Sequence, residues 1–407
     1  MRNKIRVVVF IILVSIRFWS FQIIPDSYFD VLDLVCISYM VFISITQKHK
    51  LVFKGMFLHK NILWMLFFIL FSTVPAFLVH NQSFFYSLLA LRMMGYWLFY
   101  YVLHCYSIDS KVILKILATI AVIWVTLLIV QQFTYPTIYF YTRGLGINGK
   151  EIEIRNYMYR FMTLRHHYAM ICVILFFIYY LKTRKLSWLM ISIYCLLGMY
   201  VFSTRQYLSA TVLGMFLSIF FLKGSSKVYG VILSVFIAVV AIYNLNALFG
   251  ETIAKTQGEL NETNVRYLAY NYFLFEFSDS TIGYIFGNGL AHDYSSYGER
   301  VTKINELGLY QADIGLIGSY SKFGIFYVIC VLAIHFRIIF YKMSKNGLYL
   351  RIFMIINLIL LSLSDFFTVP SAIPFYCIVF YLFDKSLHEQ KISIYEQKES
   401  LRLPNNT

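Results

Sequence analysis

The stretch that decides the fold is residues 61–79, NILWMLFFILFSTVPAFLV, which contains no charged side chain. An α-helix rises about 1.5 Å per residue, so it needs about 20 mostly apolar residues to cross the hydrocarbon core of a bilayer. A run of this length and composition predicts a membrane-spanning helix. Soluble domains are about half apolar and a quarter charged, so they seldom carry such a run.

Similar runs recur along the whole chain. They lie at approximately 6–24, 28–46, 61–79, 84–106, 112–132, 167–181, 187–203, 207–222, 228–248, 318–341, 349–365 and 370–384. Of the 407 residues, 59% are hydrophobic and 14% are charged, and the mean hydropathy is +0.68. The sequence therefore predicts an all-α, polytopic integral membrane protein with about twelve transmembrane helices.

The first run follows Arg2, Lys4 and Arg6, as the apolar core of a signal peptide would. Arg17 interrupts the run, and no small-residue cleavage site follows it. We therefore expect a retained first helix. The polar segments between the runs are too short for interdomain linkers, which favours a single membrane domain over residues 1–407.

The distribution of basic residues predicts the orientation. If alternate connections lie on one side, that side holds 22 of the 35 lysines and arginines, together with both termini and the tail 385–407. The positive-inside bias makes this side cytoplasmic, and the long connections 133–166 and 249–317 then lie outside. Because the basic residues flank apolar runs, the net charge of +15 does not indicate a nucleic-acid partner.

Charged residues inside apolar runs are costly, so each needs a partner or a function. Arg17 falls in the first run, Asp30 and Asp33 begin the second, and Arg92 lies in the outer half of the fourth. A structural ion pair between Arg17 and either aspartate is the expected arrangement. Arg92 is a candidate for binding substrate, with a structural contact inside the bundle as the alternative.

The first long loop, 133–166, interleaves basic and aromatic side chains. Its candidate ligand-binding residues, with those at its end, are Arg143, Arg160, Arg165, His166 and His167. Guanidinium groups offer planar forks for phosphate oxygens, and aromatic rings can pack on sugar faces. The alternative is a basic segment that touches anionic lipid headgroups. Arg205, alone between two apolar runs, has the same two interpretations, phosphate binding or snorkelling to headgroups.

Four segments resemble a known family. They are FSTRQYLSA with Arg205, NETNVRYLAYNYFLFEF with Arg266, IFGNGLAHDYSSYGER with a Gly-x-Gly turn at 287–289, and LYQADIGLIGSYSKFGIFY with Asp313. Together they resemble the C-terminal half of the O-antigen polymerase (Wzy) and O-antigen ligase superfamily. An arginine opens a periplasmic helix, and a polar residue precedes an apolar helix with paired glycines. From its residues alone, the Gly-x-Gly segment is also a tight turn between loop helices.

The resemblance implies a glycosyltransferase of GT-C-like architecture in the bacterial inner membrane, with its active site facing the periplasm. It would join undecaprenyl-diphosphate-linked oligosaccharides into O-antigen or a related lipopolysaccharide or surface polysaccharide. A flippase and a chain-length regulator of the same pathway would be its partners. Arg205 and Arg266 would stabilise the diphosphate leaving group, with Arg165 next, and loop tyrosines such as Tyr270 would shape the sugar sites.

The base that accepts the acceptor proton has two candidates. The resembling ligases carry a histidine shortly before the final glycine-bearing helix, where this chain has Asp313, and the nearest loop histidine is His292. This departure favours a polymerase over an O-antigen ligase, the closest alternative.

No HExxH, DxD or complete Walker motif occurs, and no dinucleotide-binding glycine pattern falls between a predicted strand and a helix, so neither a metal nor a cofactor is expected. A lipid-linked oligosaccharide flippase or other transporter is the alternative from another class. It would be expected to show repeated halves and charges deep in a central cavity, and the sequence shows neither.

Overall fold

The structure is a computed structural model. It describes residues 2–18, 26–47, 49, 51, 55–137, 139, 154–155, 158–159, 161, 166–202, 204–232, 264–343 and 347–400, without the side chains of 26–27, 154–155, 205 and 391–400. Its α-helices are α1 (Arg2–Ser15), α2 (Asp26–Thr46), α3 (His59–Phe71), α4 (Thr73–His80), α5 (Phe84–Leu91), α6 (Leu98–Tyr106), α7 (Ser110–Thr134), α8 (His166–Thr183), α9 (Leu186–Val201), α10 (Arg205–Phe220), α13 (Val265–Asn271), α14 (Thr281–Phe286), α15 (Ser296–Glu306), α16 (Gly315–Phe340), α17 (Leu348–Leu360) and α18 (Ile373–Ser400). Shorter elements are η3 (Arg92–Trp97), η4 (Tyr272–Glu276), η5 (Gln311–Ile314), η7 (Phe366–Thr368) and the antiparallel strand pair β1 (Ile154–Arg155) and β2 (Met158–Tyr159).

The protein is an all-α polytopic membrane protein, as the hydropathy pattern predicts. Five described helical segments are long and apolar enough to cross a bilayer. They are Tyr28–Thr46, His59–His80, Ser110–Thr134, His166–Thr183 and Gln311–Phe340, and shorter apolar helices occupy Leu186–Val201, Gln206–Phe220 and Leu348–Leu360. Every predicted run coincides with helix except 228–248, most of which lies outside the described residues. The total of about twelve crossings stays a prediction.

Departures from regular helix occur in several of the predicted runs, among them the 3₁₀ helix η3 inside 84–106. In the run 6–24, helix α1 ends at Ser15, Arg17 adopts a left-handed φ of 48° and bonds to Asp30, and residues 19–24 lie outside the described residues. The nitrogen–oxygen distances from Arg17 are 3.4 Å to Asp30 and 4.0 Å to Asp33, which confirms the expected ion pair. In α16, Gly324 has a non-helical φ of 80° and ψ of 178°, so the helix breaks there.

The bundle is built around α8, which contacts α7, α9, α10 and α17. Most of its side chains are buried, including a continuous run from His166 to Ile178. A helix that is apolar on all faces and enclosed by other helices has no lipid-facing stripe, because protein replaces lipid on every side. The helix α8 is therefore the central element of this half of the molecule.

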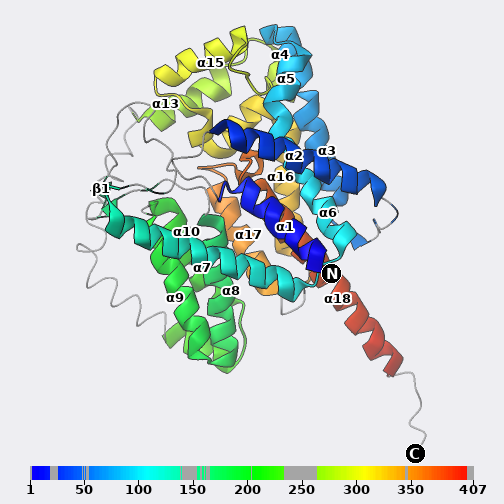
Figure 1. Ribbon diagram of the computed structural model, residues 1–407, viewed down its shortest axis with the longest axis vertical. Helices are drawn as coiled ribbons and strands as arrows, with labels where there is room; N and C mark the ends of the chain where they lie inside the picture. Colours follow the sequence, from blue (N-terminus) through cyan, green and yellow to red (C-terminus); the bar gives the residue numbers. More distant parts are fainter. Residues whose placement is uncertain are drawn as a thin grey trace, which may run out of the picture.

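The described part of the second long loop is folded into helices with their own apolar core. This core consists of Ala269, Phe273, Phe277, Tyr297, Ile304 and Ile314, all of them buried. Figure 1 shows α13 and α15 at the same end of the molecule as α4 and α5, which we call the loop end, while α18 leaves at the opposite end. The loop is thus a small helical unit seated on one end of the bundle.

The predicted orientation leads to a labelling experiment. Cysteines that replace Tyr294 or Glu299 at the loop end are expected to react with an impermeant thiol reagent added outside the cell. Cysteines that replace Lys185 or Lys385 are expected to stay unlabelled, because the predicted orientation puts the basic connections in the cytoplasm. All four native residues are described, and the six native cysteines are buried, so the parent protein supplies a low background. The reverse pattern of labelling would invert the orientation.

Candidate functional site

Polar side chains from three elements meet at the turn that follows α17. The Tyr270 hydroxyl on α13 donates a hydrogen bond to the Ser362 carbonyl oxygen. The Tyr207 hydroxyl on α10 lies 3.4 Å from Ser364 Oγ and donates to it. Because α13 belongs to the second long loop and α10 to the bundle, these contacts join the loop to the bundle at one place.

Two charged residues predicted to act in catalysis lie around this turn. The Arg266 guanidinium and the Asp313 carboxylate are both close enough to the Tyr207 hydroxyl to interact with it electrostatically. Both side chains are exposed, Arg266 in the first turn of α13 and Asp313 on η5. We call Tyr207, Arg266, Tyr270 and Asp313 the tyrosine cluster.

Backbone contacts place the elements that carry Arg266 and Asp313 against each other. Asn264 caps α13 by accepting a hydrogen bond of 2.8 Å from the Arg266 backbone N–H, which fixes where the helix begins. The short helix η5 packs against α13, and Leu316 N–H donates a 2.7 Å hydrogen bond to Leu361 O at the end of α17. Both charged residues are therefore held by backbone contacts, while their side chains stay accessible.

The tyrosines of the cluster are hydrogen-bond donors. Burial raises the pKa of Tyr270, although the positive charge of Arg266 opposes that rise. The phenol therefore stays protonated at neutral pH and keeps its bond to Ser362. It positions the Arg266-bearing helix over the end of α17.

The predicted residues His166 and His167 contribute packing beside the cluster. The His166 ring stacks on Tyr207 at a centroid distance of 3.9 Å, and the His167 ring contacts Phe366 at 4.4 Å. Each histidine is only 3% exposed. His166 thus packs directly on Tyr207, and aromatic neighbours cover the rings of both histidines.

His292 occupies a different cluster from Asp313. Its backbone N–H donates to Gln82 Oε1 at 2.9 Å, and its ring stacks on Tyr86 at 4.9 Å. Its Nδ1 accepts a 3.2 Å hydrogen bond from Tyr294 N–H. Of the two candidate bases, the structure therefore brings Asp313 to the tyrosine cluster and uses His292 to attach the loop to the segment between α4 and α5.

Arg92 also lies apart from the tyrosine cluster. Its Nη1 donates a 2.9 Å hydrogen bond to the Leu89 carbonyl, and its charge acts on Asp33 of α2. Asp33 is bonded by Tyr96 and lies near Arg17. These contacts match the structural alternative that the sequence left open for Arg92.

The remaining predicted arginines have no described side chain. Arg143, Arg160 and Arg165 lie outside the described residues. Arg205 is the first residue of α10, two positions before Tyr207, but its side chain is likewise outside the description. Its backbone is thus close to the tyrosine cluster, and its part in the site stays a prediction.

Sequence reasoning missed Tyr207 and the polar turn of residues 362–365. Asp365 in this turn is buried, accepts a 2.7 Å hydrogen bond from Tyr327 and a 3.0 Å bond from Phe367 N–H, and interacts with the charge of Lys322. A carboxylate at the end of an apolar run was the available signal for it. A tyrosine inside an apolar run gives no comparable signal.

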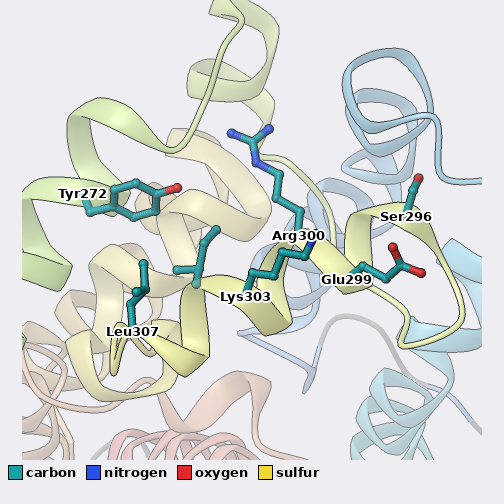
Figure 2. Close-up of a pocket in the computed structure, with 7 residues that line it drawn as sticks. Tyr272, Ser296, Glu299, Arg300, Lys303 and Leu307 are labelled. Atoms are coloured by element: carbon teal, nitrogen blue, oxygen red, sulfur yellow. The ribbon is translucent and has the colours of Figure 1, made fainter.

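A separate, shallow cavity lies between η4 and α15. It has a volume of about 290 Å³ and is lined by Tyr272, Ser296, Glu299, Arg300, Lys303, Ile304 and Leu307. Figure 2 shows Tyr272 facing α15, from which the Arg300 and Lys303 side chains extend. Arg300 Nη1 lies 2.9 Å from Asp279 Oδ2. Burial alone would lower the pKa of Arg300, but the bond and charge of Asp279 raise it, so this arginine is a fixed, paired cation.

Metal-binding groups and similarity to known proteins would be two further indications of what the site does. Among the described residues, no group of three or more histidine, cysteine, aspartate or glutamate side chains is placed to hold a metal ion. Comparison of the chain with known protein families and with curated proteins gives no match. The tyrosine cluster, an exposed guanidinium and an exposed carboxylate beside two phenols, is therefore the candidate site on its own geometry.

Proposed function

We propose that this protein is a membrane glycosyltransferase that polymerises undecaprenyl-diphosphate-linked oligosaccharide repeat units into O-antigen or a related surface polysaccharide. The observation that carries the proposal is that α13 and η5 pack together at the loop end of an all-helical bundle, and that the charges of Arg266 and Asp313, which they carry, both act on the Tyr207 hydroxyl. In transfer from a lipid diphosphate, an arginine can stabilise the charge of the leaving group and a carboxylate can accept the acceptor proton. The resemblance of the segments with Arg205, Arg266 and Asp313 supports the same assignment.

In the proposed reaction the bond between the anomeric carbon and the diphosphate oxygen of the donor breaks. The acceptor sugar hydroxyl attacks that carbon and forms the new glycosidic bond. Negative charge develops on the departing diphosphate, and Arg266, with Arg205, stabilises it by paired N–H···O bonds. Asp313 accepts the proton of the acceptor hydroxyl. Tyr270 and Tyr207 hold the elements that carry these groups.

The proposal places the protein in the bacterial inner membrane with the tyrosine cluster facing the periplasm. The lipid-linked substrate would arrive there from a flippase, and a chain-length regulator would be a partner. The deciding experiment is reconstitution of the purified protein in vesicles with one lipid-linked repeat unit as the only substrate. A ladder of lipid-linked products supports a polymerase. Transfer that requires added lipid A core indicates a ligase, and movement across the bilayer without bond formation indicates a flippase.

A pair of variants tests the assignment of the base. Asp313→Asn is expected to reduce the rate of polymerisation roughly 100-fold or more, because the amide cannot accept the proton. His292→Ala is expected to reduce that rate much less, since its ring stacks on Tyr86 away from the cluster. The rates are compared in the reconstituted assay at equal amounts of folded protein. A wild-type rate from Asp313→Asn would remove Asp313 from the mechanism.

A further inference from the structure

The break in α16 is filled by the Gly-Asn-Gly turn of the second long loop. Because the helix stops at Gly324, the carbonyls of Ser321 and Lys322 are free to accept hydrogen bonds from outside the helix. Ser321 O accepts from Asn288 N–H and from Asn288 Nδ2, both at 2.9 Å. Lys322 O accepts from Gly289 N–H at 2.8 Å. The turn and the break are therefore one joined structure.

The position of this joint along the neighbouring helices gives its depth. The Phe286 ring, immediately before the turn, lies 4.9 Å from Phe71 on α3 and 5.7 Å from Phe326 on α16. Lys60 and Arg337 are the basic residues toward the other end of these two helices. Each is about eleven residues, or roughly 17 Å of helix, from the aromatic ring that contacts Phe286.

The other end of the α3–α4 span lies nearer to Phe71. His80 closes α4 about nine residues beyond Phe71, or roughly 14 Å of helix. The hydrocarbon core of a bilayer is about 30 Å thick. A ring about 17 Å from one end of a span and about 14 Å from the other lies inside that core. Phe286 is thus at membrane depth, although the sequence assigns it to an aqueous loop.

The chain returns from this depth without regular helix, and several of its backbone donors and acceptors bond to neighbouring protein groups. Gly289 lies against Ser72 and Ala76 of the α3–α4 span, Leu290 O accepts a 2.9 Å bond from Gln82 Nε2, and His292 N–H donates to Gln82 Oε1. Irregular backbone at membrane depth is tolerated only where protein encloses it and satisfies its donors and acceptors. The bonds of Asn288, Gly289, Leu290 and His292 to α16 and Gln82 supply such partners within the segment 287–292.

The helix α14, which leads down to the turn, has an apolar face that is partly exposed. Ile282 is 43% exposed and Ile285 is 38% exposed. The helix packs on α16, where Ile325 and Ile329 are also exposed beyond the break. The exposed face of α14 therefore continues the lipid-facing surface of a membrane span. At this depth the molecules that would cover it are the acyl chains of the bilayer.

We infer that residues 281–292 form a re-entrant hairpin in the membrane, in which α14 descends into the hydrocarbon core, the Gly-Asn-Gly turn joins α16, and residues 290–292 ascend along α4. Ile282 and Ile285 contact lipid acyl chains. The hairpin anchors α13 and α15, and hence the tyrosine cluster, at a fixed height above the bilayer. This inference is independent of the proposed glycosyl transfer, because it rests on depth and contacts alone.

Spin-label accessibility tests the hairpin in reconstituted vesicles of phosphatidylethanolamine and phosphatidylglycerol. Ile282→Cys and Ile285→Cys are labelled with a nitroxide, and relaxation by oxygen, which concentrates in hydrocarbon, is compared with relaxation by a water-soluble nickel chelate. Phe67→Cys on the exposed face of α3 is the lipid control, and Tyr294→Cys, at 83% exposure, is the water control. The six native cysteines are buried, and the parent protein gives the background signal.

Labels at Ile282 and Ile285 are expected to respond more strongly to oxygen than to nickel, as the label at Phe67 does. At least a severalfold lower nickel response than that at Tyr294 is expected for both. Nickel responses equal to that at Tyr294 would place α14 in water and overturn the inference. Two positions on one face keep the test decisive if one variant folds poorly.

Discussion

Replacing Arg266 by lysine is expected to reduce turnover by roughly ten- to thousandfold, the loss that follows removal of one preorganised donor to a developing negative charge. Lysine keeps the charge but loses the planar fork that binds two phosphate oxygens at once. The Arg266 side chain is exposed, so little folding energy depends on it. The defect should therefore lie in turnover, measured as product ladders from reconstituted protein with purified lipid-linked repeat units.

Arg300→Lys is the matched control for this experiment. Arg300 belongs to the same helical unit, but it is paired with Asp279 and lines the separate cavity beyond η4. Lysine can keep that ion pair, so polymerisation should stay near the wild-type rate. Arg205→Lys is expected to behave as Arg266→Lys does. If both the Arg205 and Arg266 variants turn over at normal rates, the paired-arginine mechanism is rejected.

A lower abundance of Arg266→Ala with normal turnover per folded molecule would instead indicate a structural arginine. Folded protein is therefore quantified for every variant by its elution as a single species in detergent. This measurement separates loss of chemistry from loss of protein, which total product alone cannot do.

Hydropathy predicted the helices well because burial in lipid requires long apolar runs, whatever the tertiary structure. It did not predict that the first helix ends at Ser15, where Arg17 takes a left-handed conformation and pairs with Asp30 of the next helix. Nor did it predict the break at Gly324, since a single glycine is tolerated inside an apolar helix. The break is favourable here because Asn288 and Gly289, far away in sequence, supply the missing donors.

The candidate site was predictable only in its charged members. Arg266 and Asp313 stand out as charges in family-like segments, and the structure brings both to Tyr207. Tyr207 itself is indistinguishable in sequence from a core aromatic residue. His292 acts as an anchor through its hydrogen bond to Gln82. The two residues are 210 positions apart, so no local sequence pattern predicts this contact.

The Gly-Asn-Gly turn should be the most sensitive point in the fold. Gly287 has a φ of 83° and a ψ of 173°, a conformation that essentially only glycine adopts. A Cβ atom placed there would lie 2.3 Å from the Lys322 carbonyl oxygen, which is backbone and cannot rotate away. Gly287→Ala is therefore expected to cost about 3 kcal/mol or more and to separate the turn from α16.

Gly224→Ala provides the comparison that isolates this effect. Gly224 also has a left-handed φ, 65°, but a Cβ atom there would meet nothing within 4 Å. Its alanine variant should lose only about 1 kcal/mol, the ordinary cost of that backbone conformation. The stability losses of the two variants are compared through their apparent melting temperatures in detergent. Melting is monitored as the fraction of protein that still elutes as a single species after heating. The large drop should appear only in Gly287→Ala, because only there does strain add to a collision with the backbone of a membrane helix. Equal melting temperatures for the two variants would mean that the turn does not hold the break in α16, and the hairpin would lose its anchor.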